Sequence, residues 1–279
     1  MKTVHLYHQG RLVEQQGETV REFPVVLHVN GRKIATLIAS PHELRFLVAG
    51  FLRLQGFVNS IDDFHMLSVC EDSGTANVRI KGDLPERLEP VLTSGCGTGI
   101  TFNLPSADAR RAPAPPGRVA ADTIFRLMDE LNRRAEQYRS HGGIHSAAVG
   151  DDQGIILAAE DIGRHNTLDR IAGEALIKNI GLAGKLLVTS GRISTEMAAK
   201  AALLGITLIA SRTSPTDMAI TMCEQAGITL IGYVRGNRFT VYSHPEAFVA
   251  GAARQDEGAT VPAANFAPAR RIVAPVAAS

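Results

Sequence analysis

The sequence predicts an α/β protein built from two ordered regions. Between residues 119 and 247, segments with helical periodicity alternate with short apolar segments typical of strands, which favours a largely parallel sheet covered by helices. Before them, residues 1–108 combine a hairpin pattern with one apolar helix, which predicts a smaller α+β domain. Residues 109–118 are rich in proline and are interpreted as a linker, and residues 248–279 as a flexible tail.

Composition narrows the class of protein. The 279 residues are 45% hydrophobic, enough to bury a full core. The formal net charge of +1 argues against a general binder of nucleic acid or membrane surfaces, so any anion site is expected to be local. The N-terminus lacks the apolar core of a signal peptide, and no apolar stretch approaches the length of a membrane span. We therefore expect a cytoplasmic protein that binds neither nucleic acid nor membranes.

The first region begins with a hairpin that leads into a helix. Asn30-Gly31 is a dipeptide typical of tight hairpin turns. Ser40 and Glu43 have the spacing of a capping box, which predicts a helix starting directly after them. The expected elements are strands at 24–29, 33–39 and 76–80 and a helix at 44–54.

The second region alternates helices and strands throughout. The first helix shows the pattern most clearly, because Ile124, Leu127, Met128 and Leu131 fall on one face. Helices are expected at 122–138, 164–178, 195–204 and 215–226, and strands at 144–149, 154–159, 185–189, 206–210, 228–233 and 239–242.

A glycine-rich loop at residues 93–99 surrounds one cysteine, Cys96. Glycines on both sides leave the sulfur uncrowded, which suits a thiolate that a large partner must reach. Taken alone, the loop could equally be a turn that happens to contain a cysteine. Cys70 follows an apolar run and Cys223 lies in a predicted helix, so both are expected to be buried and inert. The three cysteines are far apart and match no zinc-binding spacing, so no metal site is expected.

Two helix starts in the second region repeat one pattern of small polar residues, arginine, any residue and serine. Arg192 and Ser194 follow one strand, while Ser211, Arg212 and Ser214 follow the next. Each second serine is expected to cap its helix, leaving free N–H groups at the carboxyl edge of the sheet. Any single turn of this kind could be a capped helix with a surface arginine.

A third turn places Arg164 and His165 at another helix start. Ligands of open α/β sheets bind at the carboxyl ends of strands, and helix N-termini with added guanidinium groups attract phosphate. Three such turns together predict a ligand with several negative charges. His165 could contact this ligand, carry a proton, or simply be a histidine satisfied by hydrogen bonds.

Several spaced motifs resemble the family of formate dehydrogenase accessory sulfurtransferases, FdhD. The resemblance covers roughly residues 20–247. The matching segments are Ser40-Pro41, Gly50-Phe51-Leu52, Thr93-Ser94-Gly95-Cys96-Gly97, Gly142-Gly143-Ile144-His145, Asp161-Ile162-Gly163-Arg164-His165-Asn166, Ser190-Gly191-Arg192-Ile193-Ser194-Thr195-Glu196-Met197 and Ser211-Arg212.

This resemblance implies a cytidine-deaminase-like three-layer domain joined to the smaller N-terminal domain, in a homodimer. It implies a sulfurtransferase in which Cys96 accepts a persulfide from a cysteine desulfurase. The sulfur then passes to the molybdenum bis-molybdopterin guanine dinucleotide cofactor required by formate dehydrogenase. The cofactor-binding segment of the family matches Tyr233, Val234, Arg235, Gly236, Asn237 and Arg238. The helix-start turns described above are suited to hold the pyrophosphate groups of this cofactor and add Arg164, His165, Arg192, Ser194, Ser211 and Arg212 to the expected cofactor-binding residues. On the residues alone, 233–238 could also be a simple hairpin turn.

One departure leaves an alternative function open. Many members of the family have a second cysteine three residues after the first, whereas this chain has Gly99 there. A relay between two cysteines of this loop is therefore impossible. The alternative is a chaperone that binds and inserts the cofactor without transferring sulfur.

A zinc-dependent base deaminase would also suit the implied fold. Such an enzyme needs a His or Cys followed by x-Glu, and a later pair of cysteines, to bind zinc and activate water. His244 and Glu246 supply only the first half of this set.

Overall fold

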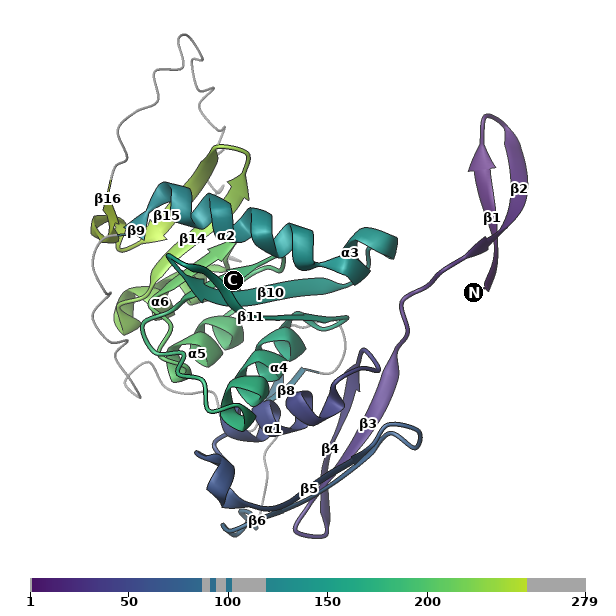
Figure 1. The fold of residues 1–279 in the computed structure, drawn as a ribbon, viewed down its shortest axis with the longest axis vertical. Helices are drawn as coiled ribbons and strands as arrows, with labels where there is room; N and C mark the ends of the chain where they lie inside the picture. The colour runs from purple at the N-terminus through teal and green to yellow at the C-terminus, as the bar shows by residue number, and fades with distance from the viewer. Residues whose placement is uncertain (1, 87–90, 94–98, 102–118, 250–279) are drawn as a thin grey trace, which may run out of the picture.

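The computed structural model describes residues 2–86, 91–93, 99–101 and 119–249. Cys96, the expected linker and most of the expected tail lie outside these residues. Two sheets with helices between and around them form the body, and a hairpin arm projects from it (Figure 1).

A six-stranded sheet forms the centre of the second region, in the order β11-β10-β12-β13-β14-β15. Its strands are β10 (His145–Asp151), β11 (Gly154–Asp161), β12 (Leu186–Thr189), β13 (Leu208–Ser211), β14 (Thr229–Arg235) and β15 (Arg238–Ser243). Only β12, β13 and β14 run parallel, while the other three pairings are antiparallel. The prediction of a largely parallel sheet was therefore wrong. Both outer pairs are hairpins, whose short turns force antiparallel pairing.

Helices cover both faces of this sheet. They are α2 (Ala121–Arg134), α3 (Glu136–His141), α4 (Arg164–Ile177), α5 (Thr195–Leu203) and α6 (Asp217–Ala226). Alternate residues of β12 explain the layering, because Leu187 packs with α4, α5 and α6 while Leu186 and Val188 pack with α2. The expected helix over 122–138 is interrupted at Ala135, where α2 ends and α3 begins. This arrangement is a helix–sheet–helix layering.

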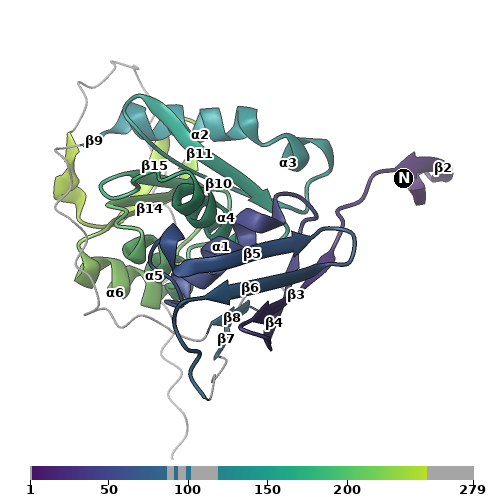
Figure 2. The same cartoon turned by 60° about the horizontal axis from the view of Figure 1, so that its bottom comes forward.

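The first region is a four-stranded sheet with one helix packed on it (Figure 2). The order β4-β3-β6-β5 is formed by β3 (Phe23–Val29), β4 (Arg32–Ala39), β5 (Phe64–Cys70) and β6 (Thr75–Ile80), and the helix is α1 (Leu44–Leu54). Two short helices also occur, η1 (Ile61–Asp63) and η3 (Pro245–Ala247). Two further pairs of short strands are β7 (Val91–Thr93) with β8 (Gly99–Thr101), and β9 (Val119–Ala120) with β16 (Phe248–Val249). The described part of the chain thus extends two residues past the predicted boundary at 247.

The two regions meet where α1 crosses α4. A Cβ added at Gly50 would lie 1.6 Å from the carbonyl oxygen of Asp169, and one at Gly173 would lie 1.9 Å from that of Phe46. Glycine at both positions lets the two helix backbones approach this closely. The crossing holds the first region against the central sheet.

The expected capping box at Ser40 and Glu43 does not form. Glu43 itself occupies the N-cap of α1, in the left-handed conformation with φ 45° and without a side-chain hydrogen bond. Ser40 is buried and bonded to residues of the second region instead. The capping prediction was wrong because the Ser40 hydroxyl accepts a hydrogen bond from the N–H of Ile162 instead of from the first turn of α1.

An arm formed by β1 (Lys2–His8) and β2 (Arg11–Gly17) stands away from the body (Figures 1 and 2). Its side chains are largely exposed, including the apolar Tyr7 and Leu12. This hairpin is not among the elements expected from the sequence.

Candidate functional site

The three parallel strands end side by side, and polar turns follow the ends of β12 and β13. Ser190, Gly191 and Arg192 follow β12, and Arg212 and Thr213 follow β13. β14 itself ends at the basic turn 235–238. The structure therefore places the turns that contain Arg192, Arg212 and Arg235 at the carboxyl ends of the three parallel strands, hereafter the strand-end site.

Serine hydroxyls lock these turns to one another. Ser211 Oγ donates to the carbonyl of Gly191 at 2.7 Å and accepts from the backbone N–H of Thr213 at 3.0 Å. Ser211 is fully buried, so its hydroxyl shapes the turns. Ser194 caps α5 by accepting from the N–H of Met197 at 3.4 Å, as predicted.

The prediction that Ser214 caps the next helix was wrong. Thr216 rather than Ser214 caps α6, because Ile193 bridges Pro215 and draws residues 214 and 215 into the sheet edge. The helix begins two residues later than the sequence pattern indicates.

Arginines surround the strand-end site without carboxylate partners. Arg192 is exposed, and Arg212 is half-buried with its Nη1 donating to Asn132 Oδ1 at 2.7 Å. Arg235 lies over the ring of Tyr233, 6.0 Å from its centroid, and Arg238 is exposed. In the described part of the chain, none of these four guanidinium groups forms an ion pair. An incoming anion would therefore meet uncompensated positive charge.

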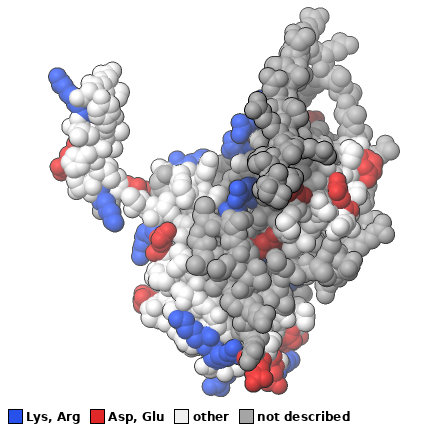
Figure 3. All heavy atoms as spheres, turned by 180° about the vertical axis from the view of Figure 1, so that it is seen from behind, with Lys and Arg blue, Asp and Glu red and all other residues white. Residues whose placement is uncertain are grey.

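The surface as a whole is not basic. On the face shown in Figure 3, Lys and Arg are interspersed with Asp and Glu outside the grey atoms. This distribution agrees with the formal net charge of +1 and is not that of a generally basic surface.

Tyr233 has an unusual backbone conformation at this edge. Its φ is 54°, in the left-handed region that few residues other than glycine adopt. Its N–H donates to the carbonyl of Thr213 at 3.1 Å, and the residue is 41% exposed. Strained residues with exposed side chains gather at ligand sites. Within the same predicted segment, Val234 is buried in the core, while Gly236 and Asn237 form the exposed turn.

The third predicted turn lies deeper in the protein. Arg164 and His165 begin α4 and are only 5% and 7% exposed. His165 Nε2 lies 3.1 Å from Ser194 Oγ and 3.4 Å from Glu196 Oε2. Burial lowers the pKa of His165 to about 3, so its ring is neutral near pH 7. Of the roles considered for it, the structure favours the histidine held by hydrogen bonds.

A buried ionic cluster of Asp169, Glu196 and Lys200 lies next to this turn and is not among the features expected from the sequence. Lys200 Nζ lies 2.9 Å from Asp169 Oδ1 and 3.2 Å from Glu196 Oε1, with all three side chains at most 6% exposed. Burial raises the pKa of Asp169 to about 6, against the opposing effect of the nearby ammonium group. Its only sequence signal is charge recurring every four residues inside otherwise apolar helices, from His165 to Asp169 and from Glu196 to Lys200.

Gly191 allows the strand-end turn to approach Arg164. A Cβ added at Gly191 would lie 3.0 Å from Arg164 Cβ and 3.4 Å from His145 Nδ1. Burial, followed by the charge of Arg164, lowers the pKa of His145. This histidine, at the first residue of β10, is a further polar side chain beside the site.

A second buried network, hereafter the junction, ties the two regions together. Arg170 Nη2 lies 2.6 Å from Asp161 Oδ2, and donates to the carbonyl of Ser40 at 2.8 Å. The N–H of Ser40 donates to Asp161 Oδ2 at 3.1 Å, and Asn166 Nδ2 donates to Asp161 Oδ1 at 2.7 Å. The paired side chains of Arg170 and Asp161 are 2% and 0% exposed. The junction thus fixes the turn that leads into Arg164.

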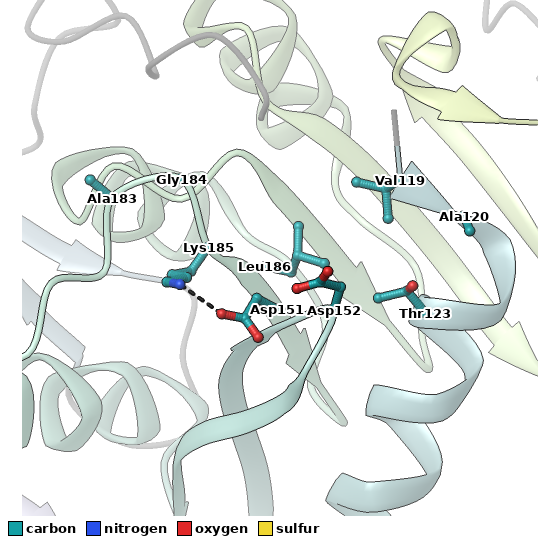
Figure 4. Close-up of a pocket in the computed structure, with 9 residues that line it drawn as sticks. All are labelled: Val119, Ala120, Thr123, Asp151, Asp152, Ala183, Gly184, Lys185 and Leu186. Carbon is teal, nitrogen blue, oxygen red and sulfur yellow. Dashed lines mark hydrogen bonds and ion pairs between the residues drawn. The ribbon is translucent and has the colours of Figure 1, made fainter. Parts of the chain in front are cut away.

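A hollow of about 580 Å³ lies at the opposite, amino edge of the parallel strands (Figure 4). Lys185 lines it, but its Nζ is 2.7 Å from Asp151 Oδ2, and Asp152 adds a second carboxylate. Because its one lysine is already paired, this hollow does not suit a ligand with several negative charges.

Of the two cysteines in the described residues, Cys223 has the environment that was predicted and Cys70 does not. Cys96 lies outside the described residues. Cys223 is buried as expected, and burial raises its pKa to about 12. Cys70 is exposed, which contradicts the prediction of burial, and hydrogen bonds from Ser73 lower its pKa. It is the last residue of β5 and points out of the sheet next to the β5–β6 turn.

Other candidate chemistries find little support in the described residues. Over residues 2–86, 91–93, 99–101 and 119–249, no group of three or more His, Cys, Asp or Glu is placed to hold a metal ion. His244 Nδ1 lies 2.9 Å from Glu246 Oε1, so the half-motif of a deaminase is paired with itself. No helix in the same ranges has the length and apolar character needed to cross a membrane.

The fold and the strand-end site define an α/β protein with a basic site at the carboxyl ends of its parallel strands. The model of the FdhD/NarQ family matches residues 20–249, and the chain belongs to this family. Two relatives called sulfur carrier protein FdhD are similar over most of their length. That of Bacillus pumilus is 36% identical, covering 87% of this chain and 95% of the relative, and that of Geobacillus kaustophilus is 34% identical, covering 88% and 95%.

A solved structure shares the fold. The crystal structure of a protein from Desulfotalea psychrophila, described as a "putative formate dehydrogenase accessory protein", superposes with a TM-score of 0.72 at 24% identity, covering 89% of this chain and 98% of that one. This likeness supports the mixed α/β architecture described above.

Proposed function

We propose that this protein is a sulfur carrier that serves the maturation of formate dehydrogenase. In this proposal Cys96 takes a sulfur atom from a cysteine desulfurase as a persulfide. The protein then passes the sulfur to the molybdenum bis-molybdopterin guanine dinucleotide cofactor, which it binds as a substrate. It would act in the cytoplasm as a homodimer.

The observation that carries the proposal is the set of uncompensated arginines at neighbouring strand ends. Arg192, Arg212 and Arg235 approach one edge from three turns, and none is neutralised by a carboxylate within the described residues. A dinucleotide cofactor carries pyrophosphate groups, and each arginine contact to a phosphate contributes about 1.5 to 3 kcal/mol. The names of the two relatives support the sulfur-carrier part independently.

The ring of Tyr233 supports binding of the guanine part. Tyr233 is 41% exposed, and Arg235 lies over its ring. Aromatic rings and guanidinium planes are surfaces on which nucleobases stack. A base stacked here would lie at the same edge as the arginines that hold its phosphates.

The first chemical step needs only the thiolate of Cys96 and the persulfide on the desulfurase. The Cys96 thiolate attacks the terminal sulfur of the desulfurase persulfide, so that a new S–S bond forms on Cys96 and the desulfurase cysteine leaves as a thiolate. Glycines on both sides of Cys96 give the large partner access to the sulfur.

The second candidate function is a cofactor-inserting chaperone that transfers no sulfur. Gly99 favours it, because this position holds a second cysteine in many of the proteins that the loop resembles. A chaperone would need the strand-end arginines but not Cys96.

Intact mass spectrometry after incubation with a cysteine desulfurase and cysteine separates these candidates. We expect an adduct of about 32 Da, the mass of one sulfur atom. Cys96→Ala should abolish the adduct, and a Cys70→Ala control should retain it; the control is needed because Cys70 is exposed. An adduct that survives in Cys96→Ala would refute Cys96 as the carrier, and a wild-type protein without any adduct would favour the chaperone.

A further inference from the structure

Asn132 occupies a place in α2 where the helix pattern would favour an apolar residue. The buried face of α2 is built by Ile124, Leu127, Met128 and Leu131, and Asn132 follows Met128 by four residues. Its side chain is half-buried between the helix and the strand-end site. A polar group in such a position needs a hydrogen-bond partner, and its partner is Arg212.

Arg212 is fixed at both ends. Its backbone N–H donates to the carbonyl of Thr189 at 3.1 Å, and its Nη1 donates to Asn132 Oδ1 at 2.7 Å. That distance is typical of a strong, charge-assisted hydrogen bond. Because a free arginine loses rotamer freedom when it binds a ligand, an arginine held in place beforehand binds more tightly.

The identity of the anchoring group matters because an amide is neutral. Two buried cations of the described residues are held by carboxylates, Arg170 by Asp161 and Lys200 by Asp169. A carboxylate would hold Arg212 at least as firmly, yet it would cancel the positive charge. The amide of Asn132 orients the guanidinium group and leaves both its charge and its other N–H groups for a ligand.

We propose that Asn132 is a positioning residue that orients Arg212 toward a phosphate group of the bound ligand without neutralising it. This inference rests on the proposed function, in which Arg212 binds the pyrophosphate of a guanine dinucleotide. It assigns α2, which carries none of the family motifs in this sequence, a part in binding.

Titration calorimetry with GDP as the probe tests the inference in the full chain. Asn132→Asp should weaken GDP binding by about ten-fold or more and flatten the dependence of the affinity on salt, although the hydrogen bond to Arg212 survives. Asn132→Ala should weaken binding by roughly three- to ten-fold, because Arg212 is freed but keeps its charge. Arg133→Gln, which makes the same change in net charge one residue along α2 on an exposed side chain, should bind GDP like the wild type.

A purely structural role predicts a different result. If Asn132 only anchored α2, Asn132→Asp would bind GDP as tightly as the wild type, and this outcome would overturn the inference. Equal weakening in Arg133→Gln would overturn it too, because the effect would then be one of net charge. Arg212→Ala distinguishes a failure of the proposed function from a failure of this inference. If Arg212→Ala leaves GDP affinity unchanged, the proposed binding role of Arg212 fails, and the positioning role of Asn132 fails with it. If Arg212→Ala weakens binding while both Asn132 variants do not, the inference alone fails.

Discussion

The junction and the strand-end site use the same cationic side chains in opposite ways. At the junction, Arg170 is buried, paired with Asp161 and bonded to the carbonyl of Ser40. At the strand-end site, Arg192 is exposed, and within the described residues the guanidinium group of Arg212 is held by the neutral amide of Asn132 alone. An arginine whose charge is already satisfied stabilises the fold, whereas one left uncompensated is available to a ligand. The partner of an arginine, more than its presence in a motif, indicates its role.

Arg164 and His165 show why this distinction is needed. Both belong to the motif that predicts ligand contacts, yet they are 5% and 7% exposed. His165 is bound to Ser194 and adjoins Glu196 of the ionic cluster. They lie between the junction and the strand-end site and connect the two.

The largest expected effect is on stability at the junction. Arg170→Ala leaves the carboxylate of Asp161 buried without its partner, which should lower the free energy of unfolding by about 3–5 kcal/mol. Urea unfolding measures this loss. Arg45→Ala, on the exposed side of α1, is the matched control and should change stability by no more than about 0.5 kcal/mol.

A double variant checks that the loss comes from the ion pair. Asp161→Asn/Arg170→Met removes both charges, so it should lose less stability than the two single variants add up to. Strictly additive losses would show that the two side chains act independently.

A smaller effect is expected in the pH dependence of stability. Because the pKa of His165 falls to about 3 on folding, the unfolded chain binds a proton below pH 6.5 that the folded chain does not. This group therefore removes stability as the pH falls, by about 2 kcal/mol between pH 6.5 and pH 5. The raised pKa of Asp169, about 6, acts in the opposite direction over the same range, because there the folded chain binds the extra proton.

Removing the imidazole should expose this balance. Urea unfolding of His165→Asn and of the wild type is measured at pH 7 and at pH 5. Between these pH values, we expect the difference in the free energy of unfolding to shift by about 2 kcal/mol in favour of the variant. A difference between the two proteins that does not change with pH would mean that His165 is not held neutral.

The sequence predicted local features well. The hairpin at Asn30-Gly31 forms between β3 and β4, and α1, α4 and α5 begin and end within one residue of their expected bounds. The turns after β12 and β13 also lie at one edge of the sheet as expected, because residues that follow neighbouring parallel strands share an edge. In each case the signal lies within a few consecutive residues.

The remaining features depend on partners distant in the sequence. Ser40 donates its N–H to Asp161, 121 residues away, and Arg212 meets Asn132 across 80 residues. Neither contact has a local signature, so Ser40 was interpreted as a helix cap and Asn132 was overlooked. Cys70 was placed in the core because its strand is apolar, yet in a sheet packed on one face alternate residues turn outward.

The most direct test of this comparison is Arg192→Ala, measured both by urea unfolding and by calorimetric titration with GDP. Arg192 is exposed, and within the described residues no hydrogen bond or ion pair holds its side chain. We expect stability to change by no more than about 0.5 kcal/mol while GDP affinity falls by roughly ten-fold. An unchanged affinity together with a loss of stability comparable to that of Arg170→Ala would contradict this expectation, because the strand-end arginines would then serve the fold as the junction does.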